Sequence, residues 1–364
     1  MPTSTRARQQ RLFEQLSSTK ADALLITHLP NIRYLTGFTG SSAALACAGN
    51  KLAFFTDGRY TTQARAEVEG ARILIPKKKS ALTAAVEWLA AQKPAAIALD
   101  ADHLTLAQSN QIKSTLKKLS SKAKLLPSPD LVARLRMTKD SGEIARIRAA
   151  NSLASAQFEP LLPHLKPGTP ETAVAAQLEF ACRIAGAEGM SFETIVAAGK
   201  RSALPHGVAS PAPLPKRGFV VLDYGVILAG YCSDMTRTVF IGRPSTRERE
   251  IYNAVLEAHE AAKAAVAPGV PCEHVDAAAR KVLARAKLAQ YFTHSTGHGV
   301  GLEIHEPPRI GKKQPETLQP GMVITIEPGA YLPALGGVRI EDMVLVTNTG
   351  CQTLTPTPKS LLTL

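Results

Sequence analysis

The sequence has 364 residues, of which 45% are hydrophobic, and its formal net charge is +13. This length is sufficient for two packed domains, because one hydrophobic core usually stops growing near about 250 to 300 residues. The composition excludes a membrane span, which needs about 18 consecutive apolar residues, and a disulfide framework, because the five cysteines are scattered and never form a Cys-x-x-Cys pair.

The first residues, 1–16, are basic and lack the apolar stretch of a secretion signal. A transit peptide is an alternative, but Glu14 and the direct run into a helical pattern favour an ordinary first helix. The lysine clusters at 77–79 and 117–124 would suit a polyanion, but no aromatic residues on which bases could stack interleave with them. We therefore expect a soluble cytoplasmic protein without a nucleic-acid or membrane partner.

Short apolar runs alternate with turn residues in the first third of the chain, which predicts an α/β domain. The runs are 23–26, 43–47, 52–55 and 95–99. A lysine-rich stretch then leads to Pro127 and Pro129, where proline and small polar residues interrupt the pattern. We place the domain boundary there, with an N-terminal domain of residues 1–132 and a C-terminal domain of residues 133–364.

The second domain contains two copies of one helical pattern. Residues 140–143 and 245–248 are capping boxes that begin helices. Each helix ends before a Pro-Gly-x-Pro segment, and the last prolines of these segments, Pro170 and Pro271, are 101 residues apart. Coincidence between two ordinary helix hairpins is the alternative. Because each copy is followed by strand formers with acidic residues, we predict a pseudo-twofold α+β domain that brings the acids together.

The first acidic segment predicts a hairpin. Asp223 ends the apolar run 219–222, and Asp234 lies in the strand-like segment that follows. A hairpin centred between Leu228 and Ala229 would place the aspartates opposite each other, with Cβ atoms roughly 4.5 to 5.5 Å apart. Two carboxylates so close repel each other unless a cation or a proton lies between them.

The second acidic segment predicts another hairpin. Glu327 ends the apolar run 322–326, and Glu341 ends a strand-forming segment. The period of two in a strand puts Arg339 on the face of Glu341, and Thr236 on the face of Asp234. Each of these carboxylates therefore has a neighbour that can orient it.

Three histidines, His294, His298 and His305, lie between the two acidic segments. A lone histidine is more often structural, but three beside a glycine-rich loop with acids on both sides favour a functional site. Four carboxylates and one imidazole suit a pair of divalent ions, with manganese, cobalt, iron or zinc all possible. Such ions lie about 3.5 to 4 Å apart and acidify a shared water, so we predict hydrolysis.

A surface location for these acids is the alternative. Asp223 and Glu327 each end an apolar run that should be buried, where an unpaired carboxylate is costly.

Five segments together resemble the pita-bread metallopeptidases, the group that contains methionine aminopeptidase, prolidase and aminopeptidase P. They are 223–225 (Asp-Tyr-Gly), 231–238 (Tyr-Cys-Ser-Asp-Met-Thr-Arg-Thr), 297–302 (Gly-His-Gly-Val-Gly-Leu), 323–329 (Val-Ile-Thr-Ile-Glu-Pro-Gly) and 337–342 (Gly-Val-Arg-Ile-Glu-Asp). Segments 31–38 and 56–61 are similar to the amino-terminal domain of creatinase, prolidase and aminopeptidase P. The resemblance implies a C-terminal pita-bread domain preceded by a creatinase/prolidase-like α/β domain.

The resemblance also implies roles for individual residues. The metal ligands would be Asp223, Asp234, His298, Glu327 and Glu341.

Further roles follow from the same resemblance. Glu327 would serve in addition as the general base. His206 and His305 would flank the substrate and stabilise the tetrahedral intermediate, and His294 would shape the substrate pocket.

Three more residues would support the site. Arg339 would orient the ligand carboxylates, Thr236 would do so for Asp234, and Tyr331 would border the site.

Methionine aminopeptidases generally lack such an N-terminal domain, so the resemblance favours an enzyme that cuts the bond before proline. We expect a manganese-dependent Xaa-Pro aminopeptidase, with an Xaa-Pro dipeptidase (prolidase) as the alternative. Arg309 is a candidate to bind a dipeptide's carboxylate, and a solvated loop residue is the alternative for it. A distant alternative is a non-catalytic binding protein of this fold. Creatinase and the binding proteins lack the ligand set that is present here. The resemblance also implies a homodimer.

Overall fold

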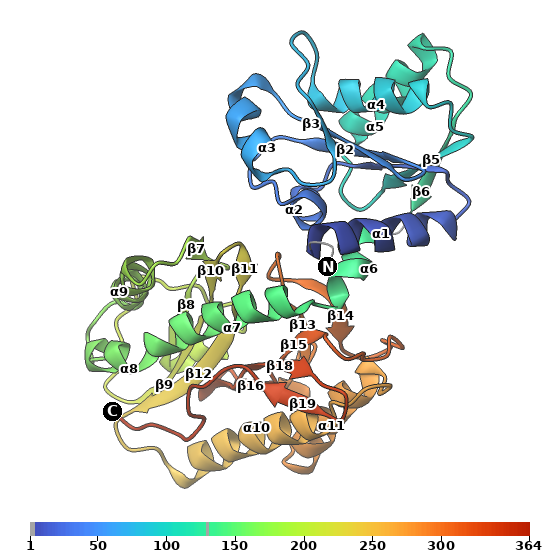
Figure 1. Ribbon diagram of the computed structural model, residues 1–364. Helices are drawn as coiled ribbons and strands as arrows, with labels where there is room; N and C mark the ends of the chain where they lie inside the picture. The colour runs from blue at the N-terminus through green and yellow to red at the C-terminus, as the bar shows by residue number, and fades with distance from the viewer. Residues whose placement is uncertain (1–3, 129–130) are drawn as a thin grey trace. The chain divides into compact units, whose positions relative to one another are not determined.

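Residues 4–128 and 131–364 are described by a computed structural model. The chain divides into two units, Met1–Arg136 and Met137–Leu364 (Figure 1). Among the described residues, no helix combines the length and the apolar character that crossing a membrane requires.

The N-terminal unit is built on a six-stranded sheet in the order β4-β3-β2-β1-β5-β6. Its strands are β1 (Ala23–Ile26), β2 (Ala44–Ala48), β3 (Lys51–Phe55), β4 (Arg72–Leu74), β5 (Ala96–Asp100) and β6 (Lys124–Ser128). Its helices are α1 (Ser4–Ser17), α2 (Leu29–Thr36), η1 (Gly58–Tyr60), α3 (Thr61–Glu67), α4 (Ala81–Ala91), α5 (Leu106–Lys118) and α6 (Leu131–Met137). The four predicted apolar runs coincide with β1, β2, β3 and β5, so the predicted α/β domain is confirmed.

The sheet is mixed, and its apolar strands form the core of this unit. β1 pairs antiparallel with β2 and parallel with β5. Helices α4 and α5 pack against each other over one face of the sheet (Figure 1), where Ala85 and Leu89 meet the side chains of Leu25 and Ala46. Burial of these alternating strand residues stabilises the unit.

The C-terminal unit consists of two sets of strands covered by helices. Its strands are β7 (Gly189–Met190), β8 (Ile195–Ala198), β9 (Gly218–Tyr224), β10 (Val226–Leu228), β11 (Tyr231–Cys232), β12 (Met235–Ile241), β13 (Gly297–Gly299), β14 (Glu306–Ile310), β15 (Val323–Ile326), β16 (Gly329–Leu332), β17 (Gly336–Arg339), β18 (Asp342–Val346) and β19 (Cys351–Thr353). Its helices are α7 (Ser141–Ala156), α8 (Phe158–Leu161), η2 (Leu162–His164), α9 (Glu171–Ile184), η3 (Gly199–Ala203), α10 (Thr246–Ala264), α11 (Cys272–Arg285) and η4 (Ala289–Tyr291).

Each half of this unit has its own hydrophobic core. The helices α7 and α9 pack on β10 and β8, whereas α10 and α11 pack on β15, β17 and β14. The strands of both halves therefore lie between two helix pairs (Figure 1). A chain of backbone and side-chain hydrogen bonds between β12 and β17 joins the halves.

The repeat predicted from the sequence is confirmed in backbone detail. Pro170 caps α9 with φ −61° and ψ 142°, and Pro271 caps α11 with φ −62° and ψ 140°. Two residues before these prolines, Gly168 and Gly269 both have left-handed φ values, 90° and 80°. The capping boxes at the starts of α7 and α10 also form.

The register predicted for the first hairpin is wrong. β9 and β12 pair antiparallel with Asp223 opposite Thr236, not opposite Asp234. The hairpin continues through β10 and β11 and turns at Ala229 and Gly230, whose φ values are 48° and 79°. Two consecutive positive φ values are typical of a tight hairpin turn. The centre of the hairpin therefore lies between Ala229 and Gly230, one residue beyond the predicted centre.

Candidate metal centre and active site

The predicted ligands all lie in the C-terminal unit, within or next to strands. Asp223 is in β9, Asp234 precedes β12, His298 is in β13, Glu327 follows β15, and Glu341 lies between β17 and β18. All five line one cavity of about 850 Å³. The repeat thus brings together the two acidic segments and the histidine-rich segment, as predicted.

The second hairpin places its two glutamates opposite each other. The β15–β18 and β16–β17 pairings share one register, in which Glu327 and Glu341 face each other across the gap between the pairs. The backbone N–H of Glu341 donates to the Thr236 carbonyl at 3.1 Å, which fixes this glutamate beside the first half. The carboxylates of both halves consequently converge.

His298 faces these carboxylates with one ring nitrogen. Its Nε2 lies 3.6 Å from Asp234 Oδ2 and 3.5 Å from Glu327 Oε1. Its Nδ1 lies 3.0 Å from the Gly299 carbonyl, which can only accept, so the hydrogen is on Nδ1 and a lone pair is on Nε2. Burial lowers the pKa of His298 to about 4, which keeps the ring neutral at neutral pH. Three ligand atoms, from Asp234, His298 and Glu341, lie within 4.8 Å of one another.

The acids resist ionisation when no cation accompanies them. Burial, reinforced by Glu341 and Asp223, raises the pKa of Asp234 well above its usual value. Burial and the charges of Glu327 and Asp223 do the same to the pKa of Glu341. Burial also raises the pKa of Glu327 to about 7, although Arg339 opposes the shift. One arginine does not compensate four carboxylates, so further positive charge is needed.

The residues present fit divalent metal ions. Asp223 Oδ2 accepts from Arg339 Nη2 at 2.6 Å, but its buried Oδ1 has no hydrogen-bond partner among the described residues. A buried carboxylate oxygen without a partner is costly, and a cation would satisfy it. Four carboxylates with one neutral imidazole form the donor set of manganese, iron, cobalt or zinc sites.

Arg339 connects the ligands of the two halves. Its guanidinium is buried and donates to Asp223, to Thr236 Oγ1 at 3.0 Å and to the Tyr331 hydroxyl at 2.7 Å. Burial opposes its charge, but Tyr331 and Asp223 raise its pKa well above the usual value, so it stays protonated. Arg339 therefore holds Asp223 in one orientation, as the partners of metal ligands commonly do.

The prediction that Thr236 orients Asp234 is wrong. Thr236 Oγ1 donates to Glu341 Oε2 at 2.6 Å instead. Residues two apart on one strand are roughly 7 Å apart, whereas residues on neighbouring strands come within about 5 Å. Because β12 runs beside β17, the hydroxyl of Thr236 reaches the ligand of the other half.

Comparison with known protein families matches residues 145–348 to "Metallopeptidase family M24". The chain belongs to this family. Residues 8–138 match the "Creatinase/Prolidase N-terminal domain". The two predicted resemblances are therefore confirmed, and this M24 chain is a metal-dependent peptidase.

Relatives of this M24 chain match it over nearly its full length. The "Uncharacterized peptidase YqhT" of Bacillus subtilis is 41% identical over 355 residues, covering 98% of each protein. The solved structure "Xaa-Pro dipeptidase from Bacillus anthracis" is 37% identical, with a TM-score of 0.94 and coverage of 99% of this chain and 100% of the other. The X-Pro aminopeptidase from Thermotoga maritima MSB8 is 35% identical, with a TM-score of 0.87 and coverage of 98% and 100%.

The histidine predicted to shape the substrate pocket of this M24 chain is held by a relay of hydrogen bonds. His294 Nδ1 donates to the Ser295 carbonyl at 2.8 Å, so its Nε2 accepts from the Tyr331 hydroxyl, also at 2.8 Å. Tyr331 in turn accepts from Arg339. Burial lowers the pKa of His294 to about 4, and the ring is neutral. Tyr331 thus lies behind the cavity and links Arg339 to His294.

The other two predicted histidines are exposed to the cavity. His206 lies in the loop after η3, and His305 lies immediately before β14. The His305 ring packs edge-on against that of His298, with centroids 4.4 Å apart. Partial burial and then the charge of His206 lower the pKa of His305. Both imidazoles can therefore reach a molecule in the cavity.

The sequence reasoning missed a buried ion pair behind the M24 ligands. Arg237 Nη2 donates to Asp342 Oδ1 at 2.7 Å, and Arg237 Nη1 donates to the Glu341 carbonyl at 2.6 Å. Both side chains are at most 2% exposed. They adjoin Thr236 and Glu341, so strand alternation places them on the opposite face. Two charges in strands that should be buried were the available signal.

The reasoning also missed several residues of the cavity wall, which come from loops that the sequence pattern does not position. They are Phe192, Glu193, Ile304, Gln314 and Glu316.

Proposed function

We propose that this chain is an Xaa-Pro dipeptidase that holds two divalent ions, most suitably manganese. The observation that carries the proposal is the convergence of five ligands in one cavity, with Glu327 held at a pKa of about 7. The names of similar proteins include both Xaa-Pro dipeptidases and an X-Pro aminopeptidase. Features of the cavity wall support a choice between these two activities.

Arg309 favours the dipeptidase. It lies opposite His298 in the β13–β14 pairing, and its exposed side chain lines the cavity. Its side chain makes no hydrogen bond or ion pair with another residue that the structure describes. A guanidinium binds a carboxylate with two parallel hydrogen bonds, so Arg309 is suited to the free carboxylate of a dipeptide. For this reason we place the dipeptidase before the aminopeptidase that the sequence led us to expect.

The size of the cavity favours the second candidate, an Xaa-Pro aminopeptidase. A space of about 850 Å³ has room for more than two residues of a peptide. A longer peptide would have to pass Arg309 without pairing its carboxylate there.

The five ligands would hold the ions through their carboxylate oxygens and the Nε2 of His298. Bound divalent ions acidify water and polarise a carbonyl, which is the chemistry that peptide hydrolysis needs. Glu327 takes the proton of the attacking water and passes it to the proline nitrogen, which has no hydrogen of its own. Its pKa of about 7 is matched to this exchange near neutral pH.

The histidines act on the substrate in this proposal. His206 and His305 donate hydrogen bonds to the carbonyl oxygen as negative charge develops on it. His294, held neutral by the Tyr331 hydroxyl, forms the wall beside Glu327, whose carboxylate lies 3.9 Å from its Nδ1. Arg339 keeps Asp223 in position throughout.

The test is hydrolysis of Ala-Pro, Ala-prolinamide and Ala-Pro-Ala by the manganese-reconstituted full chain, with metal content assayed on the same sample. We expect Ala-Pro to be cleaved fastest. Arg309→Met should raise KM for Ala-Pro by about 10- to 100-fold, as loss of a charge-assisted pair does, and should change KM for the uncharged prolinamide little. Lys312→Met removes a nearby exposed cation outside the cavity wall and is the matched control.

Faster cleavage of Ala-Pro-Ala would instead establish the aminopeptidase. Equal losses of Ala-Pro and Ala-prolinamide hydrolysis in Arg309→Met would refute the carboxylate assignment. Metal binding without cleavage of any of the three substrates would refute proline specificity.

A further inference from the structure

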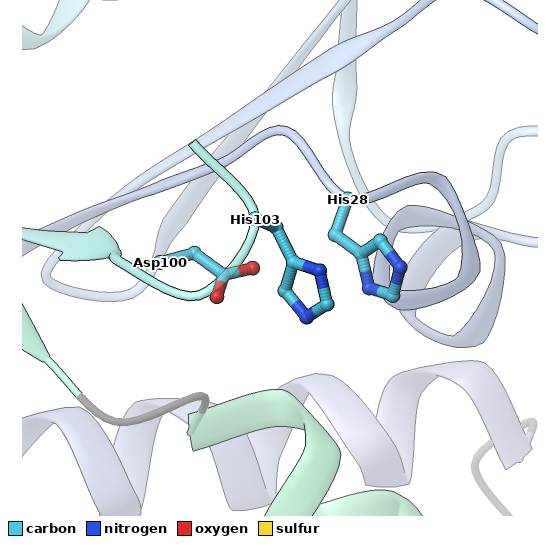
Figure 2. Close-up of side chains that lie close together, drawn as sticks. All are labelled: His28, Asp100 and His103. Carbon is cyan, nitrogen blue, oxygen red and sulfur yellow. The ribbon is translucent and has the colours of Figure 1, made fainter. Parts of the chain in front are cut away.

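We propose a second metal site in the N-terminal unit, formed by His28, Asp100 and His103 and suited to a divalent transition-metal ion (Figure 2). None of these residues belongs to the catalytic cluster, which lies in the other unit. The inference is therefore independent of the peptidase activity proposed above.

The topology of the sheet brings the three residues together. β1 and β5 are parallel neighbours, and the chain continues from β1 toward β2 on one side and from β5 toward β6 on the other. In open α/β sheets, ligands commonly bind beyond the carboxyl ends of strands where the connections diverge in this way. Asp100 is the last residue of β5, and His28 comes two residues after β1.

Local backbone geometry directs the side chains to the same place. The N–H of His103 donates to the Asp100 carbonyl at 3.3 Å and closes a turn directly after β5. His28 is the N-cap of α2 with an extended backbone (φ −73°, ψ 116°), and its side chain does not cap the helix. Its ring instead stacks on that of His103, with centroids 3.5 Å apart and planes 5° from parallel. Figure 2 shows His103 between Asp100 and His28.

The ligand atoms of the three residues lie almost as close together as in an occupied metal site. One ligand atom from each residue lies within 4.8 Å of the others. A tetrahedral ion with bonds of about 2.0 to 2.1 Å needs ligand atoms about 3.3 Å apart, so the side chains must draw inward. His103 is exposed, which gives its ring room to turn about its side-chain bonds.

Hydrogen bonds from buried residues already orient the Asp100 carboxylate. Asp100 is only 4% exposed, and its Oδ2 accepts from Asn31 Nδ2 at 3.3 Å. Asn31 Oδ1 in turn accepts from the buried Arg136 at 2.8 Å. Hydrogen bonds of this kind fix ligand carboxylates in metal sites. Asp100 is thus a fixed ligand, whereas His103 is the adjustable one.

The donor set selects the class of ion. Two imidazoles and one carboxylate suit zinc, cobalt, nickel, copper or ferrous iron, whereas calcium and magnesium prefer oxygen ligands alone. Three protein ligands leave at least one position for water or another small ligand. We use Zn²⁺ as the probe because it has no redox chemistry and tolerates a tetrahedral site.

The experiment replaces two of the five catalytic ligands and measures the Zn²⁺ that still binds. In the untagged full chain carrying Asp234→Asn and His298→Ala, Zn²⁺ is titrated calorimetrically and measured after equilibrium dialysis. We expect about one Zn²⁺ per chain with a Kd at or below about 10 µM. Adding His103→Ala should weaken this binding at least about tenfold. Because His103 is exposed, the substitution should leave the fold intact. His164→Ala, another exposed histidine, is the matched control and should bind as the parent does.

A second measurement identifies the ligands directly. Electron spin-echo spectra of bound Cu²⁺ should show two imidazoles in the parent and one in the His103→Ala variant. Unchanged Zn²⁺ binding in His103→Ala, equal weakening in His164→Ala, or no binding below about 1 mM would overturn the proposal. The histidines would then serve only as a stacked pair at the end of the sheet.

Discussion

The two halves of the C-terminal unit share a backbone plan but supply different chemistry. Their helices begin with the same capping boxes and the same Gly-x-Pro geometry. The first half contributes two aspartates and the hydroxyl of Thr236, whereas the second contributes His298, two glutamates and Arg339. Among these groups, Glu327 of the second half has a pKa of about 7, which suits proton transfer near neutrality. The halves thus share a scaffold and differ in the side chains that their hairpins supply.

The halves are also interdependent, because each orients a ligand of the other. Thr236 of the first half donates to Glu341 of the second, and Arg339 of the second half donates to Asp223 of the first. The two donors are themselves joined by the bond from Arg339 Nε to Thr236 Oγ1. Asp223 and Glu341 are therefore each held by a donor from the opposite half.

The largest expected effect tests whether the general base is Glu327 of the second half. Glu327→Gln keeps the size of the side chain but removes the base, so kcat should fall by at least about 10³-fold. Steady-state kinetics with metal analysis on the same samples measures this. Glu316→Gln, which changes an exposed carboxylate of the same cavity wall, is the matched control and should stay within about threefold of the parent. A Glu327→Gln variant that keeps one tenth or more of the parent kcat would show that another residue is the general base.

The next prediction tests the hydrogen bonds by which each half orients a metal ligand of the other. Loss of a residue that orients a metal ligand typically costs about 10- to 100-fold in metal affinity or activity. We expect about 100-fold for Arg339→Met, because its guanidinium makes four hydrogen bonds, and about 10-fold for Thr236→Val. Since the two residues contact each other, the double variant should lose less than the product. Manganese affinity and kcat are measured for all four proteins, and strictly multiplicative losses would mean that the halves act independently.

How much the sequence could predict differs between helices and hairpins. Capping boxes and Pro-Gly-x-Pro breaks are local signals, so the helices of both halves and the repeat followed from them. The turn residues Ala229 and Gly230 do not by themselves fix which residues pair across the hairpin. Its centre was predicted one residue too early, so the partner of Asp223 was predicted two residues wrong. Thr236 was assigned to its neighbour in sequence, because contact between β12 and β17 is a property of the folded sheet. Homodimer formation and cytoplasmic location stay predictions.

Removing the metal ions should make stability depend on pH in one direction. Asp234, Glu327 and Glu341 have raised pKa values in the folded chain, so without ions the folded state retains protons that the unfolded state releases. Stability then falls as pH rises, by about 1.4 kcal/mol per pH unit for each proton retained.

The pH range for this measurement is limited by two buried histidines. His294 and His298 have lowered pKa values of about 4, so below pH about 6.5 they act in the opposite direction. From pH 6.5 to 8 the carboxyls dominate, and the melting temperature of chelated enzyme should fall across this range (about 1.5 pH units) while that of manganese-loaded enzyme stays nearly level. A chelated enzyme with a flat profile would mean that the carboxyls are already ionised without ions.

The smallest expected effect concerns the N-caps of α7 and α10, where the two halves are most similar. Asp140 and Ser245 accept from the backbone N–H groups of Glu143 and Glu248, and both glutamates are buried. Each glutamate also accepts a hydrogen bond from a side chain of the first half, Glu143 from Tyr231 and Glu248 from Arg217. Asp140→Ala and Ser245→Ala should therefore each cost about 1 kcal/mol, with kcat unchanged, because the caps lie outside the cavity. Urea unfolding followed by loss of activity measures both, and a cost confined to one of them would show that only one helix pair limits the stability of the unit.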